Sequence, residues 1–360
     1  MTKPFSLTRR SLMAGTAAAA ASLAMPSIVR AQDRSLKVGV YGGYFKDSFD
    51  EHIFPAFTEA TGIEVESIAE PTGEAWLVQL QQAARAGMAP ADVSMMSQTA
   101  LRKGIATELW TPVDTARIER FNEILPPFVA AYPDDRVAGV GAVSWYITLV
   151  SNTESYPQAP ESWAFLWDPS NEGKLGLLAL ASNSFLLEVT AKTFFGGTDK
   201  LATDEGVLEV MQKLAELKPN VQLWYRDEAQ FEQALKSGEI PMGQYYHDVT
   251  GLAAKEGFPV RSTFPKEGGI SDSGSWAISS ASEKVDEAHE FMNFTTTPAI
   301  QALMARQIGT APIIRRELLD LTDDEFNAVS SSIDPIVPRY ELYVDKADWV
   351  NQKWTELIVS

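Results

Sequence analysis

The sequence predicts an α/β fold that begins with a parallel sheet covered by helices and continues into a second α/β block. Short β-branched strands alternate with helical segments in the first hundred residues, an order typical of parallel sheets. The chain has 360 residues. Single hydrophobic cores stop growing at ~250–300 residues, so two domains are expected. With 45% hydrophobic and 22% charged residues, the composition is that of a globular protein.

Residues 1–31 are interpreted as an export signal that is removed from the mature chain. A basic start precedes an apolar run from Leu12 to Met25, and Val29-Arg30-Ala31 forms a small-residue cleavage pattern. The run is shorter than the ~20 apolar residues of a membrane span. The pair Arg9-Arg10 resembles a twin-arginine export signal, and an ordinary secretory signal is the alternative. We therefore expect a periplasmic protein that is cleaved near Ala31.

The charge and the absence of cysteine exclude several kinds of partner. The formal net charge is −18, and loss of the four basic residues within residues 1–31 makes it −22. Nucleic acid and anionic membrane surfaces repel such an acidic chain. Without cysteine there are no disulfides, thiolate metal sites or lipid-anchored cysteines. We expect no nucleic-acid partner, no metal and no cofactor.

The first half alternates strand and helix patterns. Strands are expected at 36–41, 63–68 and 91–96, and helices at 47–60 and 73–87. Gly42-Gly43 ends the first strand, and Thr61-Gly62 ends the first helix. Ligands of such sheets bind beyond the carboxyl ends of the strands, where Gly42-Gly43-Tyr44 and Ser97-Gln98-Thr99 fall.

The second block starts near Trp145. Strands are expected at 143–150, 175–181, 240–246 and 275–279, and helices at 185–196, 203–217 and 230–237, with another opening at Pro160-Glu-Ser-Trp163. The C-terminal third is helical, and Thr322-Asp-Asp-Glu325 matches a capping box. Asp320, Asp323 and Asp324 lack the spacing and the glycine of a calcium loop, so they are interpreted as charges at a helix N-terminus.

Five motifs stand in one order along the chain. They are Phe57-Thr-Glu-Ala-Thr-Gly-Ile63, Ala91-Asp-Val93, Ser162-Trp-Ala-Phe-Leu-Trp-Asp-Pro169, Pro265-Lys-Glu-Gly268 and Glu287-Ala-His-Glu-Phe-Met-Asn-Phe294. Together they resemble the solute-binding proteins of ABC importers, in particular the spermidine/putrescine-binding branch, over the whole mature chain. The resemblance implies a two-lobe periplasmic binding protein fold (type II), in which each lobe is a mostly parallel sheet flanked by helices.

The resemblance also implies domain boundaries and partners. Crossing strands near 140–150 and 268–276 would join lobe 1, residues 32–145 plus 272–315, to lobe 2, residues 146–271 plus 316–360. The lobes would close on a small molecule and present it to an ABC permease in the inner membrane. A monomer is the family default.

Ligand-binding positions follow from the same resemblance. Tyr41 and Tyr44 fall near the aromatic residues of the first strand-to-helix turn, and Ser97 matches a serine at the third strand end. Asp248 matches an acid, and Tyr245 an aromatic residue, that together hold an amine of the ligand. A carboxylate beside aromatic faces suits an alkylammonium. The remaining candidates for ligand contact are Gln98, Trp145, Asn183, Arg226, Asp272 and Trp276.

Departures from the polyamine-binding pattern change the expected ligand. At two positions where polyamine binders carry an acid, this chain has the uncharged residues Leu180 and Asn183. Another such position falls on Gly274, with Asp272 two residues earlier on the same strand face. A polyamine would therefore lose much of its neutralisation, and a buried unpaired ammonium is costly.

Arg226 introduces a guanidinium that is suited to a carboxylate, although a surface ion pair with Asp227 or Glu228 is the alternative. The pattern favours a ligand with one amine and one carboxylate, such as the ω-amino acid γ-aminobutyrate. A polyamine (putrescine or spermidine) held by Asp248 and Asp272, or an opine-like compound, is the second hypothesis.

Other functions have weaker support. The chain has no G-x-S-x-G elbow, no phosphate-binding glycine loop and no H-E-x-x-H, and its histidines, His52, His247 and His289, lie far apart. The sequence therefore predicts no catalytic residues and no enzyme activity. Fe³⁺ binding through Tyr245-Tyr246 is the remaining, weaker alternative.

Overall fold

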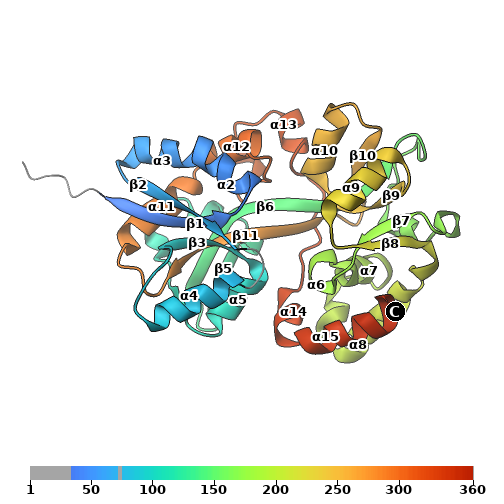
Figure 1. Cartoon of the computed structure of the whole chain (residues 1–360), viewed down its shortest axis with the longest axis horizontal. Coiled ribbons are helices and arrows are strands. Elements are labelled where there is room, and N and C mark those ends of the chain that lie inside the picture. The colour runs from blue at the N-terminus through green and yellow to red at the C-terminus, as the bar shows by residue number, and fades with distance from the viewer. Residues whose placement is uncertain (1–33, 72–74, 360) are drawn as a thin grey trace, which may run out of the picture. The chain divides into compact units, whose positions relative to one another are not determined.

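One sheet of eleven strands connects the described part of the chain in the order β2-β1-β3-β11-β6-β9-β7-β8, with β4, β5 and β10 paired beside this path (Figure 1). The structure is a computed structural model that describes residues 34–71 and 75–359. The expected export signal lies outside the described residues. The strands are β1 Ser35–Tyr41, β2 Glu64–Glu70, β3 Val93–Ser97, β4 Trp110–Thr111, β5 Val129–Ala131, β6 Val137–Asn152, β7 Leu175–Leu178, β8 Val221–Tyr225, β9 Met242–Tyr246, β10 Val260–Thr263 and β11 Ile270–Ser279.

The N-terminal strands form the parallel sheet that the sequence predicts. β1 lies between β2 and β3 and pairs parallel with both, with Tyr41 opposite Glu70. The helix expected at 47–60 consists of two α-helices separated by a π-helical turn at Phe49–Ile53. Gly62 ends it with a φ of 71°, which glycine adopts at little cost. The helices around these strands are α2 Tyr44–Ser48, α3 Phe54–Thr61, α4 Ala75–Arg85, α5 Gln98–Ile105, α11 Val285–Thr295 and α12 Pro298–Gln307.

The second block has its own parallel strands, because β7 lies between β9 and β8 and pairs parallel with both. The helix expected to open at Pro160-Glu-Ser-Trp163 is a short 3₁₀-helix at Trp163–Trp167. Asp168 is extended because it precedes Pro169, which prevents continuation as an α-helix. The remaining α-helices are α6 Ala181–Ser184, α7 Leu186–Phe194, α8 Asp204–Ala215, α9 Glu228–Ser237, α10 His247–Lys255, α13 Asp323–Asn327, α14 Tyr340–Asp345 and α15 Ala347–Trp354.

Two of the family-like motifs contact each other. The Ser162 hydroxyl donates to Oε1 of Glu267 at 2.6 Å, and the indole N–H of Trp163 donates to the carbonyl of Gly268 at 2.8 Å. Trp163 is fully buried, so its N–H needs this acceptor. The motifs at 162–169 and 265–268 therefore fix one loop against another.

In Figure 1, β6 and β11 run side by side from the elements around β1 and β3 to those around β7 and β9. Side chains of both strands belong to two core clusters. The strands pair antiparallel, with Val140 opposite Trp276 in the first core cluster and Ile147 opposite Ile270 in the second. The first core cluster includes Leu36, Phe57, Val93 and Phe291, and the second includes Leu175, Val210, Phe231 and Trp354. The strands expected to cross near 140–150 and 268–276 are thus β6 and β11. The exact lobe boundaries stay a prediction.

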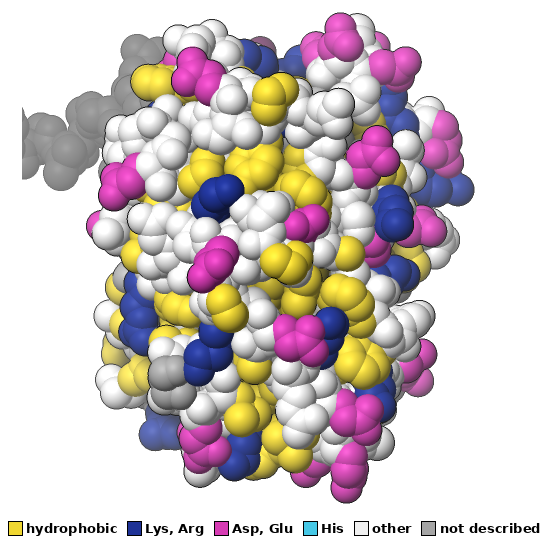
Figure 2. All heavy atoms as spheres, turned by 90° about the vertical axis from the view of Figure 1, so that its right-hand side faces the viewer, with side chains coloured by type: hydrophobic (Ala, Val, Ile, Leu, Met, Phe, Trp, Pro, Cys, Tyr) yellow, Lys and Arg dark blue, Asp and Glu magenta, His cyan; other side chains and the backbone are white. Residues whose placement is uncertain are grey.

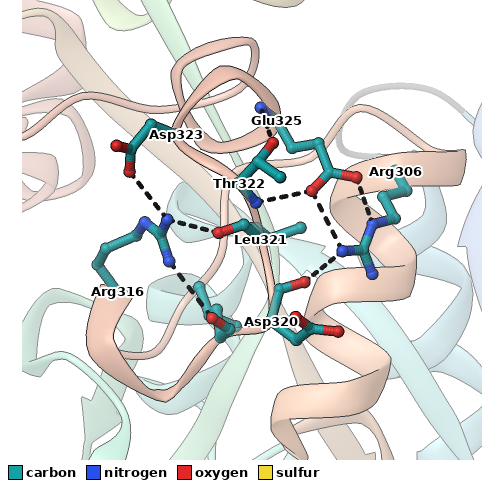
Figure 3. A network of polar contacts seen from close by, with 8 residues as sticks. Arg306, Arg316, Asp320, Leu321, Thr322, Asp323 and Glu325 are labelled. Carbon is teal, nitrogen blue, oxygen red and sulfur yellow. Dashed lines mark hydrogen bonds and ion pairs between the residues drawn. The ribbon is translucent and has the colours of Figure 1, made fainter.

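The predicted capping box at α13 is confirmed (Figure 3). Thr322 Oγ1 accepts the Glu325 N–H at 3.2 Å, and Glu325 Oε2 accepts the Thr322 N–H at 2.8 Å. Arg306 Nε donates to Glu325 Oε1 at 2.7 Å, and this guanidinium lowers the pKa of Glu325 to about 2. Arg316 pairs with Asp323 at 3.2 Å. Glu325 thus caps α13 and pairs with Arg306, while Asp323 pairs with Arg316. Among residues 34–71 and 75–359, no group of three or more side chains is placed to hold a metal ion.

The same described ranges contain no helix that is both long and apolar enough to cross a membrane.

Replacement of Gly243 tests the contact between β9 and β7. An added Cβ at Gly243 would collide with the carbonyl oxygen of Gly176, which is backbone and cannot turn away. We expect G243A to lower the free energy of unfolding by about 1–3 kcal/mol in urea titrations. The matched control is G251A within α10, where an added Cβ meets no atom within 4 Å, and a gain of about 0.5–1 kcal/mol is expected. Equal effects of the two variants would contradict this packing.

The capping box gives a second stability prediction. Thr322→Ala removes the oxygen that accepts the Glu325 N–H, and a loss of about 1 kcal/mol in the free energy of unfolding is expected. Thr322→Ser keeps that oxygen and should retain most of the stability in the same denaturation assay. A loss in T322S as large as in T322A would show that the hydroxyl is not the stabilising group.

Candidate ligand-binding site

A cavity of about 520 Å³ lies where the carboxyl ends of β1, β2 and β3 face the segment from α9 to α10. This is the edge at which ligands of parallel sheets are expected. The cavity is lined by Tyr41, Gly42, Phe45, Glu70, Pro71, Trp76, Met95, Met96, Ser97, Ala100, Trp145, Glu228, Tyr246, Asp248 and Val249. We call the residues up to Ala100 the first wall and those from Glu228 onward the second wall. Trp145, on β6, lies between them in sequence.

Tyr41 presents an unpartnered hydroxyl on the first wall. Its Oη is buried and has no hydrogen-bond partner among the described residues. The hydroxyl uses space left by Gly274, since a Cβ at that position would lie 2.9 Å from Oη. Burial, with smaller contributions from Glu70 and Asp272, raises the pKa of Tyr41 well above its usual value. The phenol is therefore neutral and can donate to a ligand.

Glu70, at the end of β2, is a buried acid of the first wall that the sequence analysis missed. It is 7% exposed, and its Oε1 accepts the Met95 N–H at 3.0 Å. Gly39 makes room for the carboxyl group, because a Cβ there would lie 2.6 Å from Oε1. Burial raises the pKa of Glu70 to about 8, although the Met95 N–H and Trp76 act in the opposite direction. At neutral pH the group is mostly a neutral carboxylic acid.

Apolar side chains complete the first wall. Trp76 is 4% exposed, and its indole N–H donates to Ser94 Oγ at 3.1 Å, which fixes the ring beside the cavity. Met95 and Met96 are buried. Ser97 accepts the Ala100 N–H at 3.3 Å as the N-cap of α5, and its hydroxyl hydrogen is not used in that bond. The wall therefore combines an apolar surface with a few O–H donors.

Asp248 is the main charged group of the second wall. It lies in the first turn of α10, and its Oδ1 is buried without a hydrogen-bond partner in the described part of the chain. Burial raises the pKa of Asp248 to about 6, while the backbone N–H of Val249 acts in the opposite direction. The group is thus mostly ionised at pH 7, with one oxygen directed to no protein donor.

Glu228 and Tyr246 complete the second wall. The Tyr246 hydroxyl donates to Glu228 Oε1 at 2.8 Å. With Glu70 and Asp248, three carboxyl groups line the cavity among residues 34–71 and 75–359, and no lysine or arginine of these ranges lines it. The arrangement suits a ligand that carries positive charge.

Four predicted site residues, Tyr41, Ser97, Trp145 and Asp248, come together in this cavity. Tyr245 does not line it. Its ring packs on Phe231 in the second core cluster, 5.7 Å between centroids. Successive strand residues face opposite sides, so Tyr246 takes the cavity side.

The other predicted residues lie elsewhere, and their ligand contacts stay predictions. Gln98 Nε2 donates to the hydroxyls of Ser273 and Ser275, at 3.0 and 2.8 Å. Asp272 Oδ1 accepts the Tyr340 hydroxyl at 2.7 Å.

Trp276 is fully buried in the first core cluster, and Asn183 is half-buried in α6. Tyr44 is 58% exposed, and its hydroxyl donates to the carbonyl of Ile308 at 3.2 Å. Arg226 is exposed and does not line the cavity.

Known relatives agree with the resemblance in the sequence. The chain is 27% identical over 301 residues to the gamma-aminobutyric acid-binding protein of Pseudomonas aeruginosa, covering 81% of this chain and 80% of the relative. It is 30% identical over 166 residues to the spermidine/putrescine-binding periplasmic protein of Escherichia coli K12, covering 45% of this chain and 46% of that relative.

Solved structures share the fold. The spermidine/putrescine ABC transporter substrate-binding protein PotD of Streptococcus pneumoniae superposes with a TM-score of 0.73 at 20% identity, covering 90% of this chain and 97% of that one. An ABC transporter structure from Clostridium perfringens gives a TM-score of 0.74 at 18% identity, covering 90% and 99%. The predicted two-lobe periplasmic binding protein fold is thereby confirmed.

The profile of the bacterial extracellular solute-binding protein family matches residues 52–328. Proteins of this family bind small molecules and deliver them to ABC permeases, and they are not enzymes. Because the match covers more than half of the chain, this protein belongs to the bacterial extracellular solute-binding proteins.

Proposed function

We propose that this binding component of an ABC importer captures a small amine-bearing solute in the cavity between the two walls. The observation that carries the proposal is the Asp248 carboxylate, whose Oδ1 is buried in the second wall without a partner. An alkylammonium supplies the missing donors in charge-assisted hydrogen bonds. The rings of Trp145 and Tyr246 line the same cavity and suit its CH₂ groups and residual charge.

We propose an ω-amino acid such as γ-aminobutyrate as the solute. The relative named for γ-aminobutyric acid matches 81% of this chain, and two relatives named for spermidine and putrescine match 45% and 66% of it. The first wall supports this choice, because Tyr41 and Ser97 offer hydroxyl donors to a carboxylate. The predicted contact of Arg226 with that carboxylate would require the exposed guanidinium to reach the cavity.

A polyamine is the second candidate, and the observation in its favour is that the described residues around the cavity supply three carboxyl groups and no lysine or arginine. An opine-like compound also combines amine and carboxylate. The available binding free energy is sufficient for any of these ligands, since micromolar affinity corresponds to about −8 kcal/mol. Hydrogen bonds to charged groups contribute roughly 1.5–3 kcal/mol each.

Export and assembly belong to the same proposal. We infer that residues 1–31 direct the chain to the periplasm, by the twin-arginine route, and are cleaved near Ala31, and that the mature protein is a monomer. The relatives named for spermidine and putrescine are periplasmic. On the face drawn in Figure 2, basic side chains lie singly or in small groups among acidic ones, which gives no continuous basic area for nucleic acid there.

Calorimetry with γ-aminobutyrate, putrescine, spermidine and common amino acids tests the ligand. We expect γ-aminobutyrate to bind most tightly and Asp248→Asn to weaken its binding roughly 10–100-fold, because the ammonium loses its counter-charge. Affinity should also fall as the pH drops below about 6, where Asp248 becomes protonated. The control, Glu256→Gln, changes an exposed acid at the far end of α10 and should bind like the wild type.

Two results would contradict the proposal in different ways. Tight putrescine binding without a response to any amino acid would exclude the ω-amino acid. Wild-type affinity in D248N would exclude Asp248 as the group that holds the amine.

A further inference from the structure

We propose, on the basis of the function proposed above, that Glu70 contacts the carboxylate of the solute as a neutral carboxylic acid. Through this contact it would select a zwitterion over a diamine. Glu70 lines the cavity and is only 7% exposed. It is a specificity-determining residue in this proposal and not a counter-charge for an amine.

The position of Glu70 supports direct contact with a ligand. It is the last residue of β2, is paired in register with Tyr41 at the end of β1, and lines the cavity with it. The Met95 N–H binds Oε1 at the sheet, where the absence of a side chain at Gly39 leaves room for it. A carboxylic acid accepts that N–H with its carbonyl oxygen and keeps its O–H for a second partner.

The surroundings favour the neutral form of Glu70. No lysine or arginine lines the cavity, and the titratable groups that face Glu70 in the described part of the chain are acids and phenols. Tyr41 lies beside it on β1, while Glu228 on α9 and Asp248 on α10 lie across the cavity. A second ionised carboxylate would be buried with no cation to balance it, which is costly. Burial accordingly raises the pKa of Glu70 to about 8.

The neutral acid gives the two walls opposite preferences. Glu70, Tyr41 and Ser97 present O–H donors to one end of a solute, whereas Asp248 presents a charged acceptor to the other. A carboxylate is stabilised by the first group and an ammonium by the second. A diamine would place an ammonium against the donors unless Glu70 lost its proton. The inferred preference is therefore for one positive and one negative end.

The sign of the pH dependence separates the two roles of Glu70. If the neutral acid binds a carboxylate, deprotonation with a pKa of about 8 weakens binding of γ-aminobutyrate about tenfold between pH 7 and pH 9. If Glu70 is instead an ionised partner of an ammonium, affinity rises over the same interval. Calorimetry at both pH values measures this directly.

Glu70→Gln is the decisive variant, because an amide keeps a donor and an acceptor but cannot ionise. We expect E70Q to abolish the loss of affinity, so that at pH 9 it binds γ-aminobutyrate about tenfold more tightly than the wild type does. Glu70→Ala, which lacks the donor, should bind roughly tenfold or more weakly at pH 7. The matched control is Glu66→Gln, which removes an exposed acid from the same strand and should retain the pH dependence.

A measurement without ligand guards against misfolding of the variants. A carboxyl group with a raised folded pKa stabilises the fold below its ordinary pKa, near 4.5, and this stability is lost as the pH rises through about 8. The thermal midpoint of wild-type protein should therefore fall more between pH 5 and pH 9 than that of E70Q. Equal falls in both proteins would overturn the neutral form.

Different results would contradict the role of Glu70 and the proposed function. Wild-type affinity for γ-aminobutyrate that rises from pH 7 to pH 9, with weak binding by E70Q at both, would overturn the role of Glu70 and leave the amine-binding function intact. A tenfold loss in Arg226→Ala together with an unchanged affinity in E70A would move the carboxylate contact to Arg226. No binding of any amine by wild-type protein would overturn the proposed function, and this inference with it.

Discussion

The antiparallel pairing of β6 with β11 is the constraint on which the rest of the structure depends. These two strands contribute side chains to both core clusters, so their register fixes where the ends of β1 to β3 lie relative to β9 and α10. Val140 opposite Trp276 sets the first cluster, and Ile147 opposite Ile270 sets the second. Trp145, between these positions on β6, consequently lines the cavity. The same backbone pairing thus builds the sheet and positions the site.

The shape of the cavity also depends on two glycines, whose lack of a side chain leaves space for neighbouring polar groups. Gly39 admits the Glu70 carboxyl, and Gly274 leaves space for the Tyr41 hydroxyl. The resemblance places an acid at the position of Gly274 in polyamine binders, and a neutral phenol uses that space here. If the resemblance holds at this position, a hydroxyl donor stands where polyamine binders carry a negative charge. Small residues on β1 and β11 decide the polarity of the first wall as much as the polar side chains themselves do.

The sequence was sufficient to predict the parallel strands, and four of its candidate site residues line one cavity. Alternating patterns predicted the parallel strands, and the resemblance located Asp248. Glu70 was missed because the strand was expected to end at Ile68, whereas β2 extends to Glu70 itself. The sequence analysis singled out Tyr245, whereas its neighbour Tyr246 lines the cavity, because successive strand residues face opposite sides of the sheet. Strand ends are the least certain part of a pattern, and this site is built at strand ends.

The surroundings raise the pKa values of two acids of the cavity by different amounts. Glu70 ends strand β2 and is 7% exposed, and burial raises its pKa to about 8. Asp248 begins a helix, where backbone N–H groups and the helix dipole favour the charged form, and its pKa rises only to about 6. Glu70 therefore keeps its proton to a higher pH than Asp248 does. A cavity lined by three carboxyl groups therefore does not have to bind a trication, because its charge depends on which of them keep their protons.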